Sequence, residues 1–285
     1  MKKSISYWAF PGGLEGSMDI GEAFRLAREM GFEAMELCIG ETGALSLKTT
    51  KKECMAIRGI AEKAGVEISS ICSGVFWSYN FGCNAKSDRD KTEKAVKQML
   101  QIGNWLGVDA MLYIPAAVDV FFNPAAEVIP YDVVRQRAIE GTKKVLKTAE
   151  KMKVSLAVEN VWNKFLSMSP IEMRDFVDSF GSPCVGCYFD VGNVLAFGYP
   201  EQWIRILGSR IRRVHFKDFK KAVADVNGFC DLLEGDVNWP EVVKALREIK
   251  YSSYCTAEMI PCYAHYPLVR VANTSRAMDA IFGRM

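Results

Sequence analysis

The sequence predicts an α/β protein built as one (β/α)8 barrel, a TIM barrel, and three observations lead to this prediction. Short apolar runs rich in β-branched and aromatic residues alternate with longer amphipathic segments, which is the pattern of repeated βα units. Eight such runs occur, enough for a closed barrel. The length of 285 residues suits this fold, because such barrels commonly contain about 250 residues. We therefore expect a single domain over residues 1–285.

The elements can be placed in chain order from these patterns. The expected strands are residues 5–10, 33–40, 66–74, 109–116, 155–160, 185–193, 212–218 and 253–259. Segments with apolar spacing near 3.6 residues include 20–30, 51–64, 92–106, 133–152, 171–180 and 240–249, and we expect these to be helices. Ser169, which precedes Pro170, and Asn238 are placed to cap the last two helices. Gly31 and Gly65 lie where a helix C-terminus favours a left-handed residue.

Composition and charge exclude several classes of protein. Apolar residues make up 49% of the chain and charged residues 25%, which gives no case for disorder. The 36 Lys and Arg against 34 Asp and Glu leave a net charge of +2, too small for a surface dedicated to nucleic acid or acidic membranes. No long uncharged apolar run and no signal-peptide pattern appears. We expect a cytoplasmic protein with no nucleic-acid or membrane partner.

The nine cysteines are scattered, odd in number and mostly placed in apolar segments. This pattern favours reduced, buried thiols over disulfides. Cys184 and Cys187 form one C-x-x-C pair, but Cys187 falls within a predicted strand and no second pair completes a zinc knuckle. We therefore do not expect a metal site at these cysteines.

Two connections are longer than a tight βα turn, residues 75–88 and 116–131. Both follow strands, so a barrel would place them on the face where active sites lie. The first contains Trp77, and the second contains Phe121 and Phe122. We expect lids or substrate walls here, and the alternative is that these loops only cap the barrel.

Four consecutive predicted strands end in an ionisable residue, although strands of parallel barrels are nearly continuously apolar. These residues are Glu159, Asp190, His215 and Glu258. Each alone has a structural explanation, because a carboxylate can cap a helix and a lone histidine is often simply hydrogen-bonded. Together they would surround half of the barrel mouth and repel one another unless a cation joined them. The donor set predicts one divalent metal ion, with Mn²⁺ favoured and Mg²⁺, Co²⁺ or Zn²⁺ admitted.

The sequence around these four residues also carries a family resemblance. Glu159 lies in VEN, Asp190 in FDVGN, His215 in VHFKD and Glu258 in AEM, and LLEGDVNWPEV begins at Leu232. With these motifs the chain resembles the xylose-isomerase-like barrel superfamily, and within it the sugar-phosphate isomerase/epimerase group. That group includes ketose 3-epimerases and L-xylulose- and L-ribulose-5-phosphate 3-epimerases.

The resemblance implies the 3-epimerisation of a ketose or ketose phosphate. A metal ion would stabilise the enediolate that forms when a proton leaves the carbon beside the carbonyl. By analogy with the family, Glu159 and Glu258 would serve as catalytic acid and base and also bind the metal. Asp190 and His215 would mainly hold the ion.

Substrate-binding candidates surround the predicted metal site. Trp8 at the first strand and Trp77 in the loop after the third offer apolar walls for a sugar face, although either can be an ordinary packing residue, and Trp162 follows the fifth strand near the ion. Asn163 follows Trp162 in the same loop. Asn193 stands where free-ketose 3-epimerases carry a histidine, and Lys221 stands where they carry an arginine. These two differences admit a phosphorylated or different polyol substrate.

Lysines near the end of the seventh predicted strand bear on the same question. Lys217 lies two residues beyond His215, on the same face of an extended strand. It can bind a substrate hydroxyl or phosphate, or it can pair with Asp190 or Asp218 as part of the scaffold. Together with nearby Lys220 and Lys221 it can provide charge-assisted hydrogen bonds to a phosphate.

Other activities remain open on the sequence alone. An aldose-ketose or hydroxypyruvate-type isomerase, an inosose dehydratase-like lyase and a non-catalytic sugar-binding protein are the alternatives, and the presence of both glutamates favours an enzyme. Apurinic-site endonucleases share this fold but need a trinuclear zinc cluster, and this chain has only two histidines, His215 and His265. We expect a small carbohydrate as substrate, and the resemblance admits a homo-oligomer, either a dimer or a tetramer.

Overall fold

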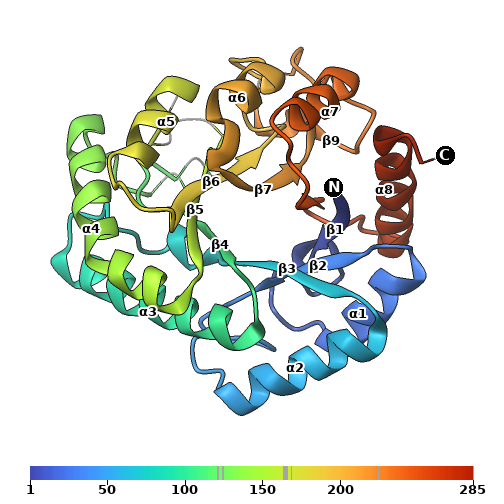
Figure 1. Ribbon diagram of the computed structural model, residues 1–285, viewed down its shortest axis with the longest axis horizontal. Coiled ribbons are helices and arrows are strands. Elements are labelled where there is room, and N and C mark those ends of the chain that lie inside the picture. Colours follow the sequence, from blue (N-terminus) through green and yellow to red (C-terminus); the bar gives the residue numbers. More distant parts are fainter. Residues whose placement is uncertain (121, 124, 163–165, 168, 224, 285) are drawn as a thin grey trace.

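Eight parallel strands close into a barrel in the computed structural model, which describes residues 1–285 except 121, 124, 163–165, 168, 224 and 285 (Figure 1). The strand order around the barrel is β1-β10-β7-β6-β5-β4-β3-β2. The strands are β1 (Lys2–Ser6), β2 (Ala34–Cys38), β3 (Glu67–Cys72), β4 (Ala110–Tyr113), β5 (Ser155–Glu159), β6 (Val185–Asp190), β7 (Ile211–Phe216) and β10 (Tyr254–Ala257). The predicted (β/α)8 fold is confirmed.

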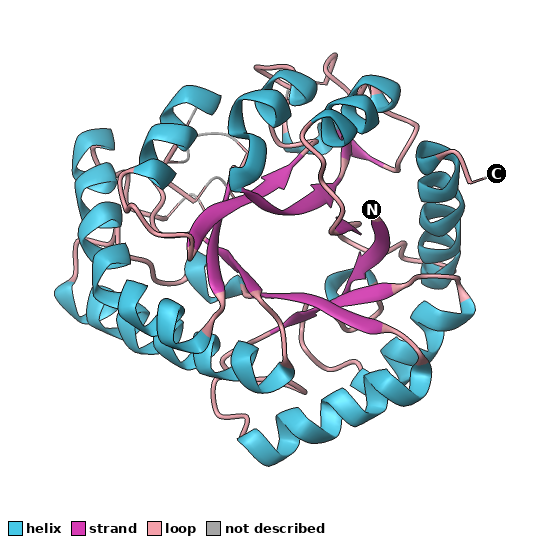
Figure 2. Ribbon diagram, in the orientation of Figure 1, coloured by secondary structure: helices cyan, strands magenta, loops and turns pink. Residues whose placement is uncertain are grey.

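Helices form a ring outside the strands (Figure 2). They are α1 (Ile20–Glu29), α2 (Lys51–Ala64), α3 (Lys86–Leu106), α4 (Tyr131–Met152), α5 (Pro170–Asp178), α6 (Pro200–Leu207), α7 (Trp239–Glu248) and α8 (Pro267–Phe282). The predicted caps are present: Ser169 and Asn238 accept hydrogen bonds at the starts of α5 and α7. Gly31 and Gly65 have φ of 82° and 68°, the left-handed conformation that ends a helix. Among the described residues, no helix is long and apolar enough to cross a membrane.

Several elements differ from the sequence-based expectation. The first strand ends at Ser6, because residues Tyr7–Ala9 turn into a 3-10 helix whose Trp8 amide lies 3.4 Å from the Ser6 hydroxyl. Helices α6 and α8 were not among the expected ones. Helix α6 has only 8 residues, and α8 contains Asn273, Thr274 and Ser275, which have weaker helix propensity than Ala or Leu. An antiparallel pair, β8 (Asp218–Phe219) and β9 (Phe229–Cys230), follows β7.

The inside of the barrel is polar along part of its length. Arg213 is buried, its Nε donates to the Ser69 carbonyl at 2.8 Å, and its guanidinium pairs with Asp109. Two residues further along β7, His215 is also buried. The cysteines are all free thiols, in line with the sequence, and Cys187 is buried in β6.

Candidate metal centre

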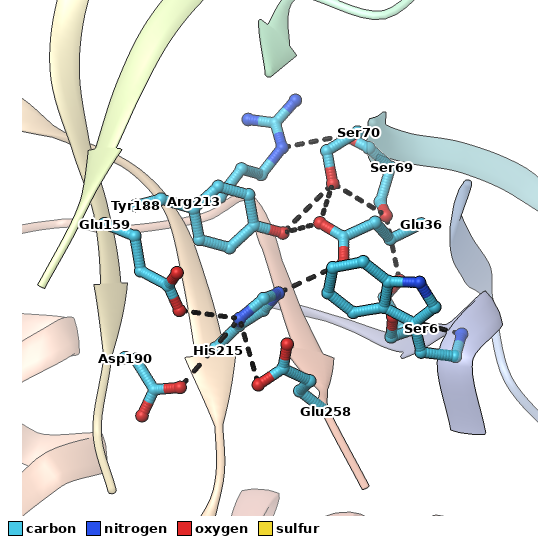
Figure 3. A network of polar contacts seen from close by, with 12 residues as sticks. Ser6, Glu36, Ser69, Ser70, Glu159, Tyr188, Asp190, Arg213, His215 and Glu258 are labelled. Atoms are coloured by element: carbon cyan, nitrogen blue, oxygen red, sulfur yellow. Dashed lines mark hydrogen bonds and ion pairs between the residues drawn. The ribbon is translucent and has the colours of Figure 1, made fainter. Parts of the chain in front are cut away.

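The barrel brings the four predicted metal ligands together at the carboxyl ends of four neighbouring strands (Figure 3). Glu159 ends β5, Asp190 ends β6, His215 lies one residue before the end of β7, and Glu258 directly follows β10. One ligand atom from each residue lies within 4.8 Å of the corresponding atoms of the other three. All four side chains are buried. This proximity follows from the parallel arrangement, in which consecutive strand ends meet at the same rim.

The donor atoms of this cluster fit a divalent cation. Nδ1 of His215 lies 3.6 Å from a Glu159 oxygen, 3.9 Å from Asp190 Oδ2 and 4.0 Å from Glu258 Oε2. Such separations suit atoms around one ion at about 2.0–2.6 Å. Among the described residues, neither His215 Nδ1 nor Asp190 Oδ2 makes a hydrogen bond, although both atoms are buried; Asp190 Oδ2 does have an ion-pair contact with Lys217. Buried polar atoms normally have hydrogen-bond partners, so the unpartnered His215 Nδ1 in particular supports a metal site.

Electrostatics supports the same interpretation. Burial raises the pKa of Glu159 to about 7, and the nearby carboxylate of Glu258 adds to this rise. Burial also raises the pKa of Asp190, against the lowering effect of Lys217. Burial alone would lower the pKa of His215, but the carboxylates of Glu36 and Glu258 outweigh it and raise that pKa well above its ordinary value. Glu159, Asp190 and His215 therefore bind protons more readily than the free residues do, and a divalent cation would compete with those protons.

Lys217 lies at the edge of this cluster. Its Nζ forms a close ion pair with Glu258 and lies 3.3 Å from Asp190 Oδ2. Burial alone would lower the pKa of Lys217, but the two carboxylates outweigh burial and raise it. The sequence offered Asp190 and Asp218 as structural partners of Lys217, and in the structure its ammonium group contacts Asp190. The same side chain also lines the cavity above the cluster, where a substrate hydroxyl could reach it.

Asp218 instead organises the segment that contains the LLEGDVNWPEV motif. Its carboxylate accepts hydrogen bonds from Leu233 N at 3.0 Å, Val237 N at 3.2 Å and Trp239 Nε1 at 2.9 Å. A Cβ at Gly235 would lie only 2.1 Å from Asp218 Oδ1, so this close approach requires glycine. The motif therefore fixes the loop before α7, and its role here is structural.

Two asparagines of the motifs position Asp190. The Asn160 side chain bridges the strand ends: its Nδ2 donates to the Asp190 carbonyl at 2.8 Å and its Oδ1 accepts from the Asp190 amide at 2.9 Å. The Asn193 amide donates to Asp190 Oδ1 at 2.8 Å, and its side-chain Nδ2 lies 3.5 Å from Glu159 Oε1. Asp190 is therefore held from both sides, with Oδ2 turned toward the other ligands.

A cavity of about 550 Å³ opens above the cluster. Glu159 and Glu258 lie at its base. The substrate-binding candidates that line it are Trp8, Trp162, Asn193 and Lys217. Lys221 is exposed and lies outside this lining, with its backbone amide donating to Asp236 at 2.8 Å. Asn163 lies outside the described residues.

The two long loops form part of the cavity wall. Trp77 comes from the loop after β3 and Phe122 from the loop after β4. Their rings meet edge to face with centroids 5.3 Å apart. The predicted location on the active face is therefore correct, while a lid movement stays a prediction. Phe121 lies outside the described residues.

A carboxylate that the sequence analysis missed contacts His215 from the side opposite the other three cluster residues. Glu36, in the middle of β2, is fully buried, and its Oε1 lies 3.1 Å from His215 Nε2. Its Oε2 accepts hydrogen bonds from the Tyr188 hydroxyl at 2.5 Å and from Ser70 at 3.0 Å. Burial raises the pKa of Glu36, but His215 outweighs it and the pKa is lowered. The sequence did contain one sign of this residue, because Glu36 is a charged residue between Met35 and Leu37 inside a predicted strand.

Comparison with known proteins agrees with this architecture. The sequence profile of the family described as "Xylose isomerase-like TIM barrel" matches residues 24–277. The L-ribulose-5-phosphate 3-epimerase UlaE of Salmonella typhi is 25% identical over 267 residues, covering 93% of this chain and 89% of that protein.

Solved structures show the same fold at lower identity. D-psicose 3-epimerase from Clostridium cellulolyticum H10, solved with D-tagatose, has a TM-score of 0.78 and 17% identity, covering 99% of both chains. The 3-keto-D-glucoside 4-epimerase YcjR from E. coli has a TM-score of 0.77 and 15% identity, also covering 99% of both. The IolI protein, solved with a zinc atom, has a TM-score of 0.79 and 13% identity, covering 100% of this chain and 99% of that one.

Proposed function

Since the chain belongs to the xylose isomerase-like TIM barrel family, we propose that it is a metal-dependent isomerase or epimerase that 3-epimerises a ketose or ketose phosphate. The observation that carries this proposal is the buried cluster of Glu159, Asp190, His215 and Glu258 at the base of an open cavity. The full-length similarity to an L-ribulose-5-phosphate 3-epimerase and the shared fold with ketose 3-epimerases support it.

The two glutamates are the proposed acid and base. Epimerisation requires removal of a proton beside a carbonyl and its return on the opposite face. Glu159 and Glu258 line the cavity and belong to one cluster, so a sugar carbon above them would have a carboxyl group on each side. When bound, a divalent ion would stabilise the negative charge that develops on the substrate oxygens.

The remaining lining residues would hold the sugar. Trp8 and Trp162 would pack against an apolar face, and Asn193 and Lys217 would bind hydroxyl groups. Among the described lining residues, Lys217 and Arg270 are the cationic ones, and both already pair with carboxylates. This favours an uncharged sugar end in the cavity. A phosphate would instead have to reach beyond the described lining of the cavity, for example to Lys221, which is exposed and follows β8.

Exchange of substrate protons with solvent deuterium tests the activity before the product is known. We would incubate the protein and Mn²⁺ with a panel of ketoses and ketose phosphates in deuterated buffer and follow exchange by NMR. We expect deuterium at the carbon beside the carbonyl in at least one compound, with loss of exchange when a chelator removes the metal. A metal-loaded protein that exchanges no proton in any member of the panel would refute the proposal.

Four finer statements belong to the same proposal. We propose Mn²⁺ as the ion, because three of the four ligands are carboxylates. The protein would act in the cytoplasm, fold as one domain and assemble as a dimer or tetramer. Elemental analysis of the purified protein and light scattering test the metal and the assembly, respectively.

A further inference from the structure

His215 is the one nitrogen ligand of the proposed metal centre, and its ring has two distinct edges. Nδ1 faces the carboxylates of Glu159, Asp190 and Glu258 at 3.6–4.0 Å. Nε2 faces away from them, toward Glu36 Oε1 at 3.1 Å (Figure 3). A ring rotated by half a turn would present carbon atoms to both sides. Only one of the two ring orientations therefore hydrogen-bonds to Glu36 and also offers Nδ1 to an ion.

Glu36 is itself held rigidly. Its second oxygen, Oε2, accepts from Tyr188 and Ser70, and these two hydroxyls lie 3.0 Å from each other. The Tyr188 ring packs on the His215 ring with centroids 4.4 Å apart. Among the described hydrogen bonds, Oε1 receives only the His215 nitrogen. Residues on β3 and β6 therefore hold the Glu36 carboxylate through Oε2, and its other oxygen, Oε1, points toward His215 on β7.

A glutamate buried in the middle of a strand is costly unless donors surround it. Here three donors satisfy it, and one of them is the proposed metal ligand. Glu36 is not among the described residues that line the cavity, and its hydrogen bond to the four-residue cluster is the one to His215.

We propose that Glu36, supported by Tyr188 and Ser70, is a positioning residue that keeps the proton of His215 on Nε2 and leaves the Nδ1 lone pair for the metal. This inference rests on the proposed metal centre. Carboxylates behind ligating histidines fix the tautomer and strengthen the ligand, and their loss typically weakens metal binding by about 10- to 100-fold.

The first test is the affinity for Mn²⁺, measured by calorimetry with chelator competition at the same pH for the wild type and every variant. Glu36→Gln keeps the size of the side chain but removes its charge, and Tyr188→Phe keeps the ring but removes one donor to Oε2. We expect Kd to rise about 10- to 100-fold in the first variant and by a smaller factor in the second. Glu67→Gln is the matched control, because Glu67 lies on β3 and pairs with Lys2 at the opposite end of the barrel.

The second test observes the tautomer directly. The chain has two histidines, so the ¹⁵N-histidine spectrum of the Zn²⁺-loaded protein contains two side chains, and His265→Gln assigns them. We expect a slowly exchanging proton on Nε2 of His215, which exchanges faster in Glu36→Gln. A merely structural glutamate would change stability without moving this signal.

The outcomes separate the inference from the proposed function. If Glu36→Gln does not fold, Tyr188→Phe still reports on the same oxygen. A Kd within about threefold of wild type in folded Glu36→Gln, which is below the expected range, an unchanged Kd in Tyr188→Phe where Glu36→Gln does not fold, or a proton on Nδ1 of His215 overturns the inference. A wild-type protein that binds neither Mn²⁺ nor Zn²⁺ refutes the metal centre itself.

Discussion

Asn160 offers the sharpest test of how the motifs build the site. We predict that Asn160→Ala weakens both the fold and the metal centre, because the Asn160 side chain forms two hydrogen bonds, to the amide and to the carbonyl of Asp190. Both groups are buried, and alanine would remove their partner. A buried polar group left without a partner costs about 1–3 kcal/mol. The free energy of unfolding should therefore fall by about 2–6 kcal/mol, the sum over two such groups.

The assay has two parts with one control. Denaturant unfolding in the presence of a chelator measures the loss of stability, and calorimetry with Mn²⁺ measures affinity in the folded protein. Since Asp190 is a proposed ligand, its displacement should also raise the metal Kd by about 10- to 100-fold. Asn104→Ala is the control: Asn104 also donates to a backbone carbonyl, that of Met152 at 2.9 Å, but it is exposed and belongs to α3.

Two results would contradict this reasoning. Equal losses of stability in the Asn160 and Asn104 variants would show that burial of the bridged groups carries no special cost. A large loss of stability with an unchanged metal Kd would show that Asn160 supports the strands without positioning Asp190.

Three further predictions concern the same centre. Glu159→Gln and Glu258→Gln should each reduce turnover by about 10²- to 10⁴-fold while retaining bound metal, because an amide oxygen still ligates but cannot carry the proton; full activity in either variant removes that residue from the chemistry. Mn²⁺ affinity should fall as the pH drops, because the raised pKa of His215 and the pKa of Glu159, raised to about 7, make protons compete with the ion; a Kd that does not change between about pH 8 and about pH 6 contradicts this. Gly235→Ala should lower the free energy of unfolding by about 1–3 kcal/mol, because the new methyl group meets Asp218 at 2.1 Å; unchanged unfolding shows that the loop adapts.

Most of the barrel was predictable from the sequence because its signals are local. Apolar runs indicated the strands, and the caps Ser169 and Asn238 placed the starts of α5 and α7 to within about two residues, the usual uncertainty of such boundaries. The start of α3, which has no side-chain cap, was missed: it begins at Lys86 and not at Thr92. Predicted strands ran past their ends where buried apolar residues continue into loops, as at Tyr7 and Trp8. Periodicity cannot separate a strand end from a buried 3-10 turn, since both bury the same kind of side chain.

The proximity of the four proposed ligands was predictable from the sequence. They come from strand ends, and strand order alone brings them to one rim. Glu36 was missed because it belongs to β2, which does not neighbour β7 in the barrel, and contacts His215 only across the barrel interior. Contacts of this kind depend on which side chains point inward at the same level, which one sequence does not reveal.

The contacts also show that the sequence motifs determine the geometry of the four proposed ligands but not the shape of the cavity wall. Asn160 and Asn193 both contact Asp190, and Gly192 permits the close approach of the Lys217 carbonyl, which would lie 2.8 Å from a Cβ. These residues set the geometry of the metal ligands. The cavity wall instead comes from loops, including Trp77 and Phe122. Motif matches therefore predict the metal chemistry of this chain better than its sugar, and changes in these loops are where substrate preference should change while metal affinity stays constant.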